Sequence, residues 1–302
     1  MGEPKISLRY QLEKAAPRVG AGGVTRGASV REFPASVGIA GVSMRLALGS
    51  MRELHWHANA AESAYVVSGN CRTTVLHPSG EAATDTFGPG DVWCFPRGWG
   101  HSIQGLGPAE CHFILIFDNG DFSEDHTFSV TNWLSQTPPD IVSQHLGLSS
   151  VELVGLPDGE ADFAKGPVPD DRSPDATARP AAQLISTHHY PLLAQQPRRV
   201  AGGGTQRVVT VNEFPISSSM ASSILEIQPG RCVSFIDTRM LTSGSIISKA
   251  TRRWPFFLPT GRPSRRISKP ATLDMPHGNW PLYPQHRAVS PAGPDRLQQW
   301  TL

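Results

Sequence analysis

The sequence predicts an all-β fold: an antiparallel β-barrel with short helices, followed by part of a second barrel and a tail without regular structure. Glycine (29 residues) and proline (27) are abundant, whereas only 18% of the residues are charged. This composition favours short strands joined by turns. Between residues 39 and 117, short apolar segments alternate with Gly, Pro, Asn and Asp, which is the spacing of a sandwich or barrel. A later segment repeats an earlier one, which predicts the second barrel.

Composition and charge exclude several classes of protein. Apolar residues make up 39% of the 302-residue chain, enough for a buried core. The formal net charge is +1, so bulk electrostatics recruit neither nucleic acid nor an anionic membrane. No apolar stretch is long enough to cross a bilayer. The first residues lack the apolar core of a signal peptide, so we expect a cytoplasmic protein, or a secreted one if an upstream exon is missing.

The cysteines do not predict a disulfide framework or a thiolate metal site. They form no CxxC pair, and three of them fall in strand-like segments, where a buried free thiol is expected. The four positions are Cys71, Cys94, Cys111 and Cys232.

The expected elements follow in order along the chain. Residues 39–49 form a strand that runs into a turn, and the segments ELHWH, SAYVV, CRTTVL, DVWCFP and CHFILIF supply the next strands. From Thr131 to His145 the pattern is helical, and the Pro-Pro pair within it starts a second turn. Residues 156–180 are polar and rich in proline and aspartate, which indicates a linker.

A gap-free internal repeat indicates a duplicated domain. Residues 22–49 align with residues 203–230 at a constant offset, because Phe33 and Phe214 differ by 181. The first copy continues into RELHWH, but the second shows no such continuation. The predicted division is an N-terminal extension (1–21), a metal-binding barrel domain (22–146), a linker (147–199), the start of a second barrel domain (200–230) and a non-homologous tail (231–302).

Two strings in the first copy carry candidate metal ligands. The first, G-x5-HxH-x4-E-x6-G, contains His55, His57 and Glu62, and the second, G-x5-PxG-x2-H, ends on His101. Side chains two apart on a strand share a face, so the first two histidines point together. Three imidazoles and one carboxylate suit a divalent ion such as Mn, Fe, Ni or Zn. The remaining histidines lack such framing and are expected to be surface or structural residues: His77, His112, His126, His145, His188 and His189.

These two strings are the motifs of the cupin superfamily, and residues 20–230 resemble the bicupin oxalate decarboxylases. The resemblance is carried by GIAGVSMRLALGSMRELHWH, GDVWCFPRGWGHSIQGLG and FDNGDFSEDHTFSVTNWLSQTP. It implies a cupin double-stranded β-helix barrel, jelly-roll-like in architecture. It also implies manganese in each cupin and the splitting of oxalate to formate and carbon dioxide, with dioxygen required but not consumed. One manganese site is expected in this chain.

The resemblance assigns roles to two further residues. Arg52, three positions before His55, matches the family's substrate-binding arginine, whose guanidinium pairs with a carboxylate of oxalate. Glu124, in the segment Ser-Glu-Asp-His that resembles the family's flexible lid, matches the glutamate that relays the proton.

The chain departs from the family in the four residues between His57 and Glu62, where three are usual, in the bulkier residues before His101, and in Ser63, which follows Glu62 where tryptophan is usual. We expect the loss of the tryptophan to loosen the pocket or admit water.

The sequence of residues 231–302 indicates that this part of the gene is translated in a shifted reading frame. Reverse translation of residues 231–247 with a shift of two nucleotides permits Leu-Cys-Glu-Leu-His-x-His-Pro-Asn-Ala-Asp-Glu-Trp-Gln-Tyr-Tyr, which is the missing second HxH motif. We therefore expect residues 231–302 to be out of frame. Proline every few residues and the absence of a sustained period predict disorder there. The local excess of Arg and Lys is then no nucleic-acid site.

The favoured function is a manganese-dependent oxalate decarboxylase with one intact site, acting on a small molecule. Two alternatives remain open. An activity resembling oxalate oxidase follows if the lid fails, with peroxide in place of formate as the product. A non-catalytic cupin, binding a metal or small ligand, follows if the truncated second half inactivates the chain. The sequence also leaves open whether the chain forms a homo-oligomer.

Overall fold

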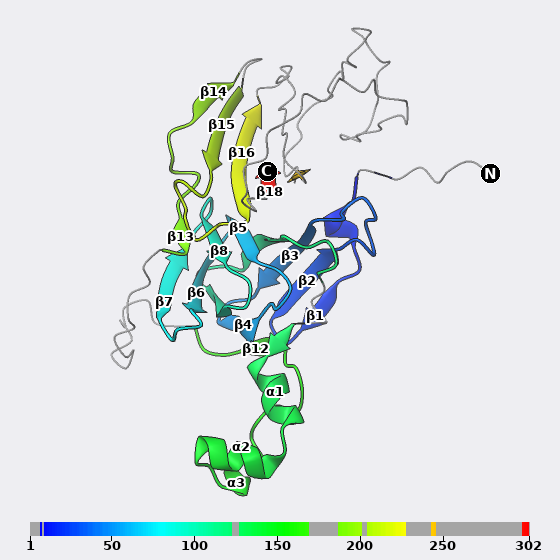
Figure 1. The fold of residues 1–302 in the computed structure, drawn as a ribbon, viewed down its shortest axis with the longest axis vertical. Helices are drawn as coiled ribbons and strands as arrows, with labels where there is room; N and C mark the ends of the chain where they lie inside the picture. The colour runs from blue at the N-terminus through cyan, green and yellow to red at the C-terminus, as the bar shows by residue number, and fades with distance from the viewer. Residues whose placement is uncertain are drawn as a thin grey trace, which may run out of the picture.

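A computed structural model describes residues 7, 9–122, 127–168, 187–200, 204–227, 243–245 and 298–301. It confirms the predicted antiparallel β-barrel (Figure 1). The barrel strands are β1 (Arg18–Gly20), β2 (Gly23–Ala28), β3 (Ala40–Leu46), β4 (Ser50–Trp56), β5 (Glu62–Ser68), β6 (Asn70–Leu76), β7 (Ala82–Phe87), β8 (Val92–Phe95), β9 (Gly100–Leu106) and β10 (Cys111–Phe117).

Two sheets enclose the core of this barrel. One has the strand order β1-β2-β3-β10-β5-β8-β13, where β13 is His189–Tyr190. The other has the order β11-β4-β9-β6-β7, with β11 (Phe128–Ser129) at one end and β12 (Phe163–Lys165) also paired with β4. Because successive side chains point to opposite faces of a strand, every second residue of a barrel strand points toward the core. Completely buried core residues include Leu46, Val66, Phe87, Ile103 and Phe113.

Short helices follow the barrel, as predicted for the segment from Thr131 to His145. They are α1 (Val130–Gln136), α2 (Pro139–Leu146) and α3 (Ser150–Leu153), in addition to η1 (Leu12–Lys14) near the N-terminus. The helical segment breaks at Pro138, because proline lacks the N–H that a continuing helix needs and fits the start of the next one. Figure 1 shows α1, α2 and α3 projecting from the barrel beside β12. None of the helices that the structure describes is both long enough and apolar enough to span a membrane.

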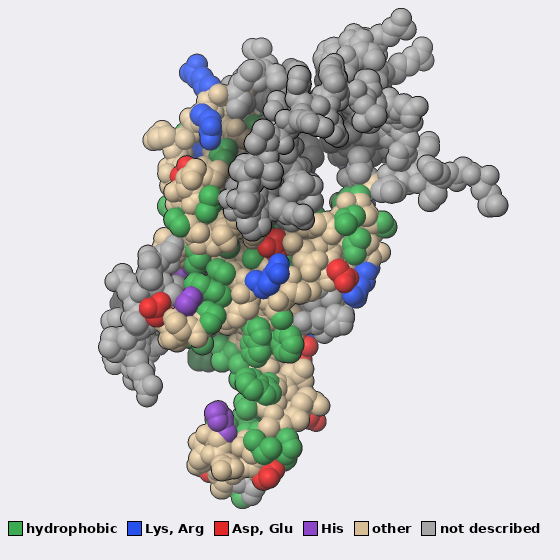
Figure 2. All heavy atoms as spheres, in the orientation of Figure 1, with side chains coloured by type: hydrophobic (Ala, Val, Ile, Leu, Met, Phe, Trp, Pro, Cys, Tyr) green, Lys and Arg blue, Asp and Glu red, His purple; other side chains and the backbone are tan. Residues whose placement is uncertain are grey.

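Hydrophobic side chains gather where α1 leaves the barrel (Figure 2). The ring of Trp56 stacks on Phe128, with 5.4 Å between centroids, and meets the exposed Trp133 edge-on. These contacts fix the start of α1 against β4, the strand that carries the first candidate ligand.

Two parts of the predicted linker belong to the first barrel. Residues 163–165 pair with β4 and residues 189–190 pair with β8. The predicted linker 147–199 is therefore wrong at these positions. Both segments cover the edge of a barrel strand, whose backbone N–H and C=O groups would otherwise be exposed.

The predicted repeat is seen as a second hairpin, whose strands pair in the same register as β2 and β3 of the first barrel. It consists of β14 (Arg198–Val200), β15 (Gly204–Val209) and β16 (Met220–Ile227). Gly23 faces Leu46 in the first hairpin, and Gly204 faces Ile227 in the second, so both partners move by 181. The same backbone pairing arises twice from similar local sequences.

The turn inside each hairpin is also held in the same way. The Glu32 carboxylate accepts hydrogen bonds from the N–H and hydroxyl of Ser29, and the Glu213 carboxylate accepts the equivalent pair from Thr210. In both turns the carboxylate contacts the backbone and side chain of a residue three positions earlier, so no distant partner is needed.

The repeat extends further toward the N-terminus of each copy than the gap-free alignment indicates. The rings of Tyr10 and Phe33 lie 5.7 Å apart, and so do those of Tyr190 and Phe214. The second copy thus begins before residue 200, within the segment predicted as linker. Positions that correspond at an offset of 180 are Tyr10 and Tyr190, Leu12 and Leu192, Pro17 and Pro197, and Arg18 and Arg198.

The second copy packs against the outer face of the first barrel. Leu192 and Phe214 are buried in one cluster with Val92 and Cys94 of β8. Their first-copy equivalents, Leu12 and Phe33, are only partly buried. The two copies therefore present the same side chains to different surroundings.

Most of residues 231–302, including Cys232, lies outside the described residues. Two short strands within it are described, β17 (Ser243–Ser245) and β18 (Gln298–Thr301). β18 pairs in parallel with both β16 and β17. At these strands the structure departs from the expected tail without regular structure, and the shifted reading frame stays a prediction. Elsewhere, Cys71, Cys94 and Cys111 are free and buried, as predicted.

Candidate metal centre

The barrel brings the four predicted ligands together in its interior. His55 lies on β4, His57 directly after it, Glu62 opens β5 and His101 lies on β9. Each residue is between 1% and 4% exposed. One ligand atom from each lies within 4.8 Å of the others. Pairing of β4 with β9 places His55 opposite His101, which explains how ligands distant in sequence meet.

Hydrogen bonds orient two of the imidazoles. His55 Nδ1 donates to the carbonyl oxygen of Glu53 at 2.6 Å, and His101 Nδ1 donates to that of Trp99 at 2.9 Å. In neutral imidazole only one nitrogen carries hydrogen, so each ring keeps its Nε2 lone pair for the interior. A backbone carbonyl on the far nitrogen is the usual support for a metal-bound histidine.

The Glu62 carboxylate is held from both sides. Its Oε1 accepts a hydrogen bond from Trp93 Nε1 at 2.9 Å, and its Oε2 lies 3.0 Å from His57 Nε2. The indole leaves only Oε2 to face the other ligands.

The pKa values favour the protonation states that a metal requires. Burial lowers the pKa of His55 well below its ordinary value and that of His57 to about 4. Burial alone would raise the pKa of Glu62, but the neighbouring His101 and His57 hold it below its ordinary value. At neutral pH His55 and His57 are therefore neutral and Glu62 is ionised, the forms that bind divalent ions.

The donor set fits a divalent cation. His101 Nε2 is buried and has no hydrogen-bond partner among the described residues, and its 3.5 Å separation from Glu62 Oε2 is too long for a strong hydrogen bond. A buried nitrogen without a partner is costly unless something else satisfies it. A cation among the four ligand atoms would satisfy this nitrogen and also neutralise the carboxylate.

Aromatic rings that the sequence analysis did not identify enclose the site. Phe95 stacks on His101, and both Phe117 and Phe122 meet the ring of His57 edge-on. They separate the ligands from bulk water and lower the local dielectric. Their only sequence signal is the apolar pattern of the strands, which does not distinguish a site wall from core.

Ser63 lies next to a candidate ligand but takes no part in the ligand set, and the expectation that this position loosens the pocket or admits water stays a prediction. It follows Glu62 on β5, so its side chain points to the opposite face of the strand. There its hydroxyl donates to the carbonyl oxygen of Trp93 at 3.1 Å, and the residue is buried.

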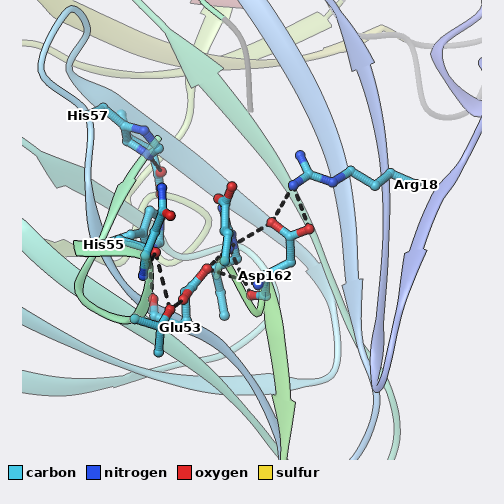
Figure 3. A network of polar contacts seen from close by, with 11 residues as sticks. Arg18, Glu53, His55, His57 and Asp162 are labelled. Carbon is cyan, nitrogen blue, oxygen red and sulfur yellow. Dashed lines mark hydrogen bonds and ion pairs between the residues drawn. The ribbon is translucent and has the colours of Figure 1, made fainter. Parts of the chain in front are cut away.

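Arg52 lies beside the ligands and inside a polar network with Glu53 and Asp162, which are both labelled in Figure 3. It is 1% exposed, and its positive charge contributes to the lowered pKa of His55 and His57. The β4–β9 register shifts between Arg52 and His55. This irregularity lets two residues three apart face the same side of β4, which a regular strand does not allow.

Sequence reasoning missed the acidic partners of this arginine. Arg52 Nη1 donates to Glu53 Oε1 at 3.2 Å and to the carbonyl oxygen of Asp162 at 2.8 Å. Its Nη2 lies 3.6 Å from Glu160 Oε1. Asp162 in turn forms an ion pair with Arg18 (Figure 3).

Glu124 lies outside the described residues, but both flanks of its segment meet the site. Phe122 contacts His57, and Ser129 pairs with His55 across β11 and β4. The segment therefore leaves and rejoins the described chain beside the candidate ligands.

Comparison with known proteins identifies the fold and its relatives. Residues 10–153 match the cupin family model. The chain is 35% identical over 224 residues to oxalate decarboxylase OxdC of Bacillus subtilis, covering 74% of this chain and 57% of that protein. It is 30% identical over 228 residues to a probable oxalate decarboxylase of Arthroderma benhamiae, covering 75% of this chain and 55% of the relative. The chain thus spans little more than half the length of these relatives.

Solved structures agree with the sequence relatives. A structure of Bacillus subtilis oxalate decarboxylase from a study of its Mn(II) centres superposes with a TM-score of 0.70 at 34% identity. The superposition covers 76% of this chain and 60% of the other. Residues 10–153 thus match the cupin family, and over about three quarters of its length the chain is similar in sequence and fold to oxalate decarboxylases.

Proposed function

We propose that this chain binds one Mn²⁺ through His55, His57, Glu62 and His101 and converts oxalate to formate and carbon dioxide, with dioxygen as co-catalyst. The observation that carries the proposal is the buried quartet with Arg52 at its side. The relatives named oxalate decarboxylase and the study of Mn(II) centres in one of them support the choice of substrate and metal.

The residues of the chain have separate tasks in this proposal. A bound manganese ion would supply a Lewis acid and a one-electron redox centre. Arg52 would pair with the carboxylate of oxalate that stays intact, holding the substrate against charge that develops as the carbon–carbon bond breaks. Phe95, Phe117 and Phe122 would exclude water, which strengthens that ion pair.

Decarboxylation also needs a proton at the carbon that becomes formate. Glu124 is the proposed acid and base, taking a proton from the substrate and returning it to carbon. If this proton is not delivered, the same centre would oxidise oxalate to two molecules of carbon dioxide and pass the two electrons to dioxygen, which becomes peroxide; this is the oxidase-like alternative.

The test measures metal and products together. Manganese-loaded full-length chain should hold about one ion per chain and release formate from oxalate. His55→Ala combined with His57→Ala should remove both the metal and the formate. His145→Ala is the matched control, because His145 is exposed on α2; it should change neither.

Each alternative has its own result. Peroxide without formate would favour the oxidase-like reaction. Retention of one ion per chain with neither product would favour the non-catalytic cupin. A wild-type chain that binds no metal would overturn the proposal itself.

A further inference from the structure

Glu53 is a buried carboxylate that the proposed reaction does not use. It is 4% exposed and lies on β4 between Arg52 and His55, where the strand register shifts. A buried carboxylate is expensive unless every oxygen is satisfied, so its partners indicate why it is present.

Both oxygens of Glu53 accept hydrogen bonds, one from the neighbouring Arg52 and two from distant parts of the chain. Oε1 accepts from Arg52 Nη1 at 3.2 Å and from the backbone N–H of Asp162 at 2.9 Å. Oε2 accepts from the hydroxyl of Thr131 in the first turn of α1. Three donors converge on one side chain, and the two oxygens of a carboxylate can accept from all of them.

Asp162 closes the other side of the same arrangement. Its carbonyl oxygen accepts from Arg52 Nη1 at 2.8 Å and from the Glu53 N–H at 3.1 Å. Its φ is +52°, which makes it the one non-glycine residue of the described chain in the left-handed region. Such a conformation costs free energy and persists where surrounding contacts enforce it, and here the contacts are those that hold Arg52 and the backbone of Glu53.

We infer that Glu53 is a positioning residue for Arg52. Together with Asp162 it forms a clamp, defined by these two residues, that fixes the guanidinium beside the metal ligands before substrate arrives. An arginine held in advance loses less conformational freedom when a carboxylate binds. The role in substrate binding rests on the proposed function, whereas the clamp itself does not.

The contact to Thr131 gives the clamp a second consequence. Thr131 lies in the first turn of α1, which follows the segment that contains Glu124. Glu53 therefore links the substrate-binding arginine to the C-terminal side of that segment through one side chain. A change at Glu53 should disturb the arginine and this anchor together.

The experiment compares Glu53→Ala and Glu53→Gln in the full-length, manganese-loaded chain. Glutamine keeps an oxygen for Arg52 and Asp162 and offers its amide to the Thr131 hydroxyl, so it should preserve most of the geometry. We expect the dissociation constant for oxalate, measured by calorimetry, to rise about tenfold or more in Glu53→Ala. It should rise by about threefold in Glu53→Gln, and manganese should stay at about one ion per chain in both, because His55 bonds the backbone of Glu53.

A second measurement is independent of oxalate. Phenylglyoxal labels accessible arginines, and mass spectrometry reports the rate at Arg52 against the exposed Arg31. Labelling of Arg52 should accelerate in Glu53→Ala and stay slow in Glu53→Gln. Glu13→Gln, which removes a carboxylate from the ion pair with Arg45, is the matched control and should change neither readout.

The outcomes separate the clamp from the proposed function. If Arg52 labels at the parental rate in Glu53→Ala, the clamp is overturned whatever happens to oxalate. Equal loss of manganese from both variants with unchanged labelling would also overturn it, since it would indicate a structural role. If the wild type binds no oxalate but Glu53→Ala exposes Arg52, the clamp stands and the proposed function falls.

Discussion

The two copies of the hairpin differ in what surrounds them, not in how they are built. Gly23 faces Leu46 and Gly204 faces Ile227 in the same register, and the turns carry the same carboxylate contacts. Yet β3 continues the sheet through antiparallel β10, whereas β16 pairs in parallel with β18. Local sequence therefore suffices to specify the hairpin, but a metal centre also needs the distant strands that return to it.

The largest expected effect tests the view that the first copy supplies the chemistry. Glu124→Ala should reduce formate production by about 10²–10⁴-fold, the usual contribution of a general acid or base. Peroxide should persist or rise, because the metal ligands and Arg52 remain, whereas Arg52→Ala should depress both products. Formate and peroxide assays check this.

Glu226→Ala in the second copy is the matched control and should leave formate unchanged. Formate at the parental rate in Glu124→Ala would remove that residue from the mechanism and strengthen the non-catalytic alternative.

The next effect concerns stability at equivalent positions of the two copies. Phe214 is 2% exposed against β8, while Phe33 is only partly buried. Phe214→Ala should lower the free energy of unfolding by about 3–5 kcal/mol, the cost of truncating a core aromatic residue. Phe33→Ala should cost about half as much, because less apolar surface is lost.

Urea unfolding of both variants provides the measurement. Equal losses would show that the first-copy phenylalanine is buried just as deeply in solution, and the contrast between the copies would disappear.

The smallest expected effect is a pH dependence of the stability of the fold, caused by a histidine where the second copy meets the first barrel. Burial alone would lower the pKa of His189, but Asp85 and Asp91, each 3.2 Å away, raise it. A raised pKa stabilises the fold below the ordinary value of about 6.5, and this contribution is lost as pH rises through the folded-state pKa. His189→Gln should therefore cost about 1 kcal/mol or less near pH 6 and nothing near pH 9.

Thermal unfolding of wild type and His189→Gln across this range checks the sign. His188 acts in the opposite direction, since burial lowers its pKa to about 4 and acid must charge it. A loss in His189→Gln that grew with pH would contradict the assignment of the ion pairs.

The metal ligands could be predicted because they lie at fixed spacings within two short sequence motifs. The barrel followed from the recurring apolar segments for the same reason. The contact of Arg52 with Asp162 could not be predicted, because the two residues are 110 positions apart and meet through the pairing of β12 with β4. Nor does any local pattern signal the register shift that turns Arg52 toward His55.

The repeat was found only in part for a physical reason. One extra residue separates β14 from β15 compared with the turn between β1 and β2, since Gly20 pairs with Gly23 but Val200 pairs with Gly204. The offset changes from 180 to 181 at that turn, so an alignment without gaps loses the Tyr10 and Tyr190 segments. A loop tolerates such an insertion with little cost.

The pairing of β13 with β8 sets an order of events during synthesis. A ribosome makes the chain from the N-terminus, so strands β1 to β10 emerge while the edge of β8 still lacks its partner. Until residues 189–190 leave the ribosome, the nascent barrel exposes an open row of backbone donors and acceptors. The first barrel can therefore collect its metal ligands early, but it acquires a protected edge only after translation has passed into the second copy.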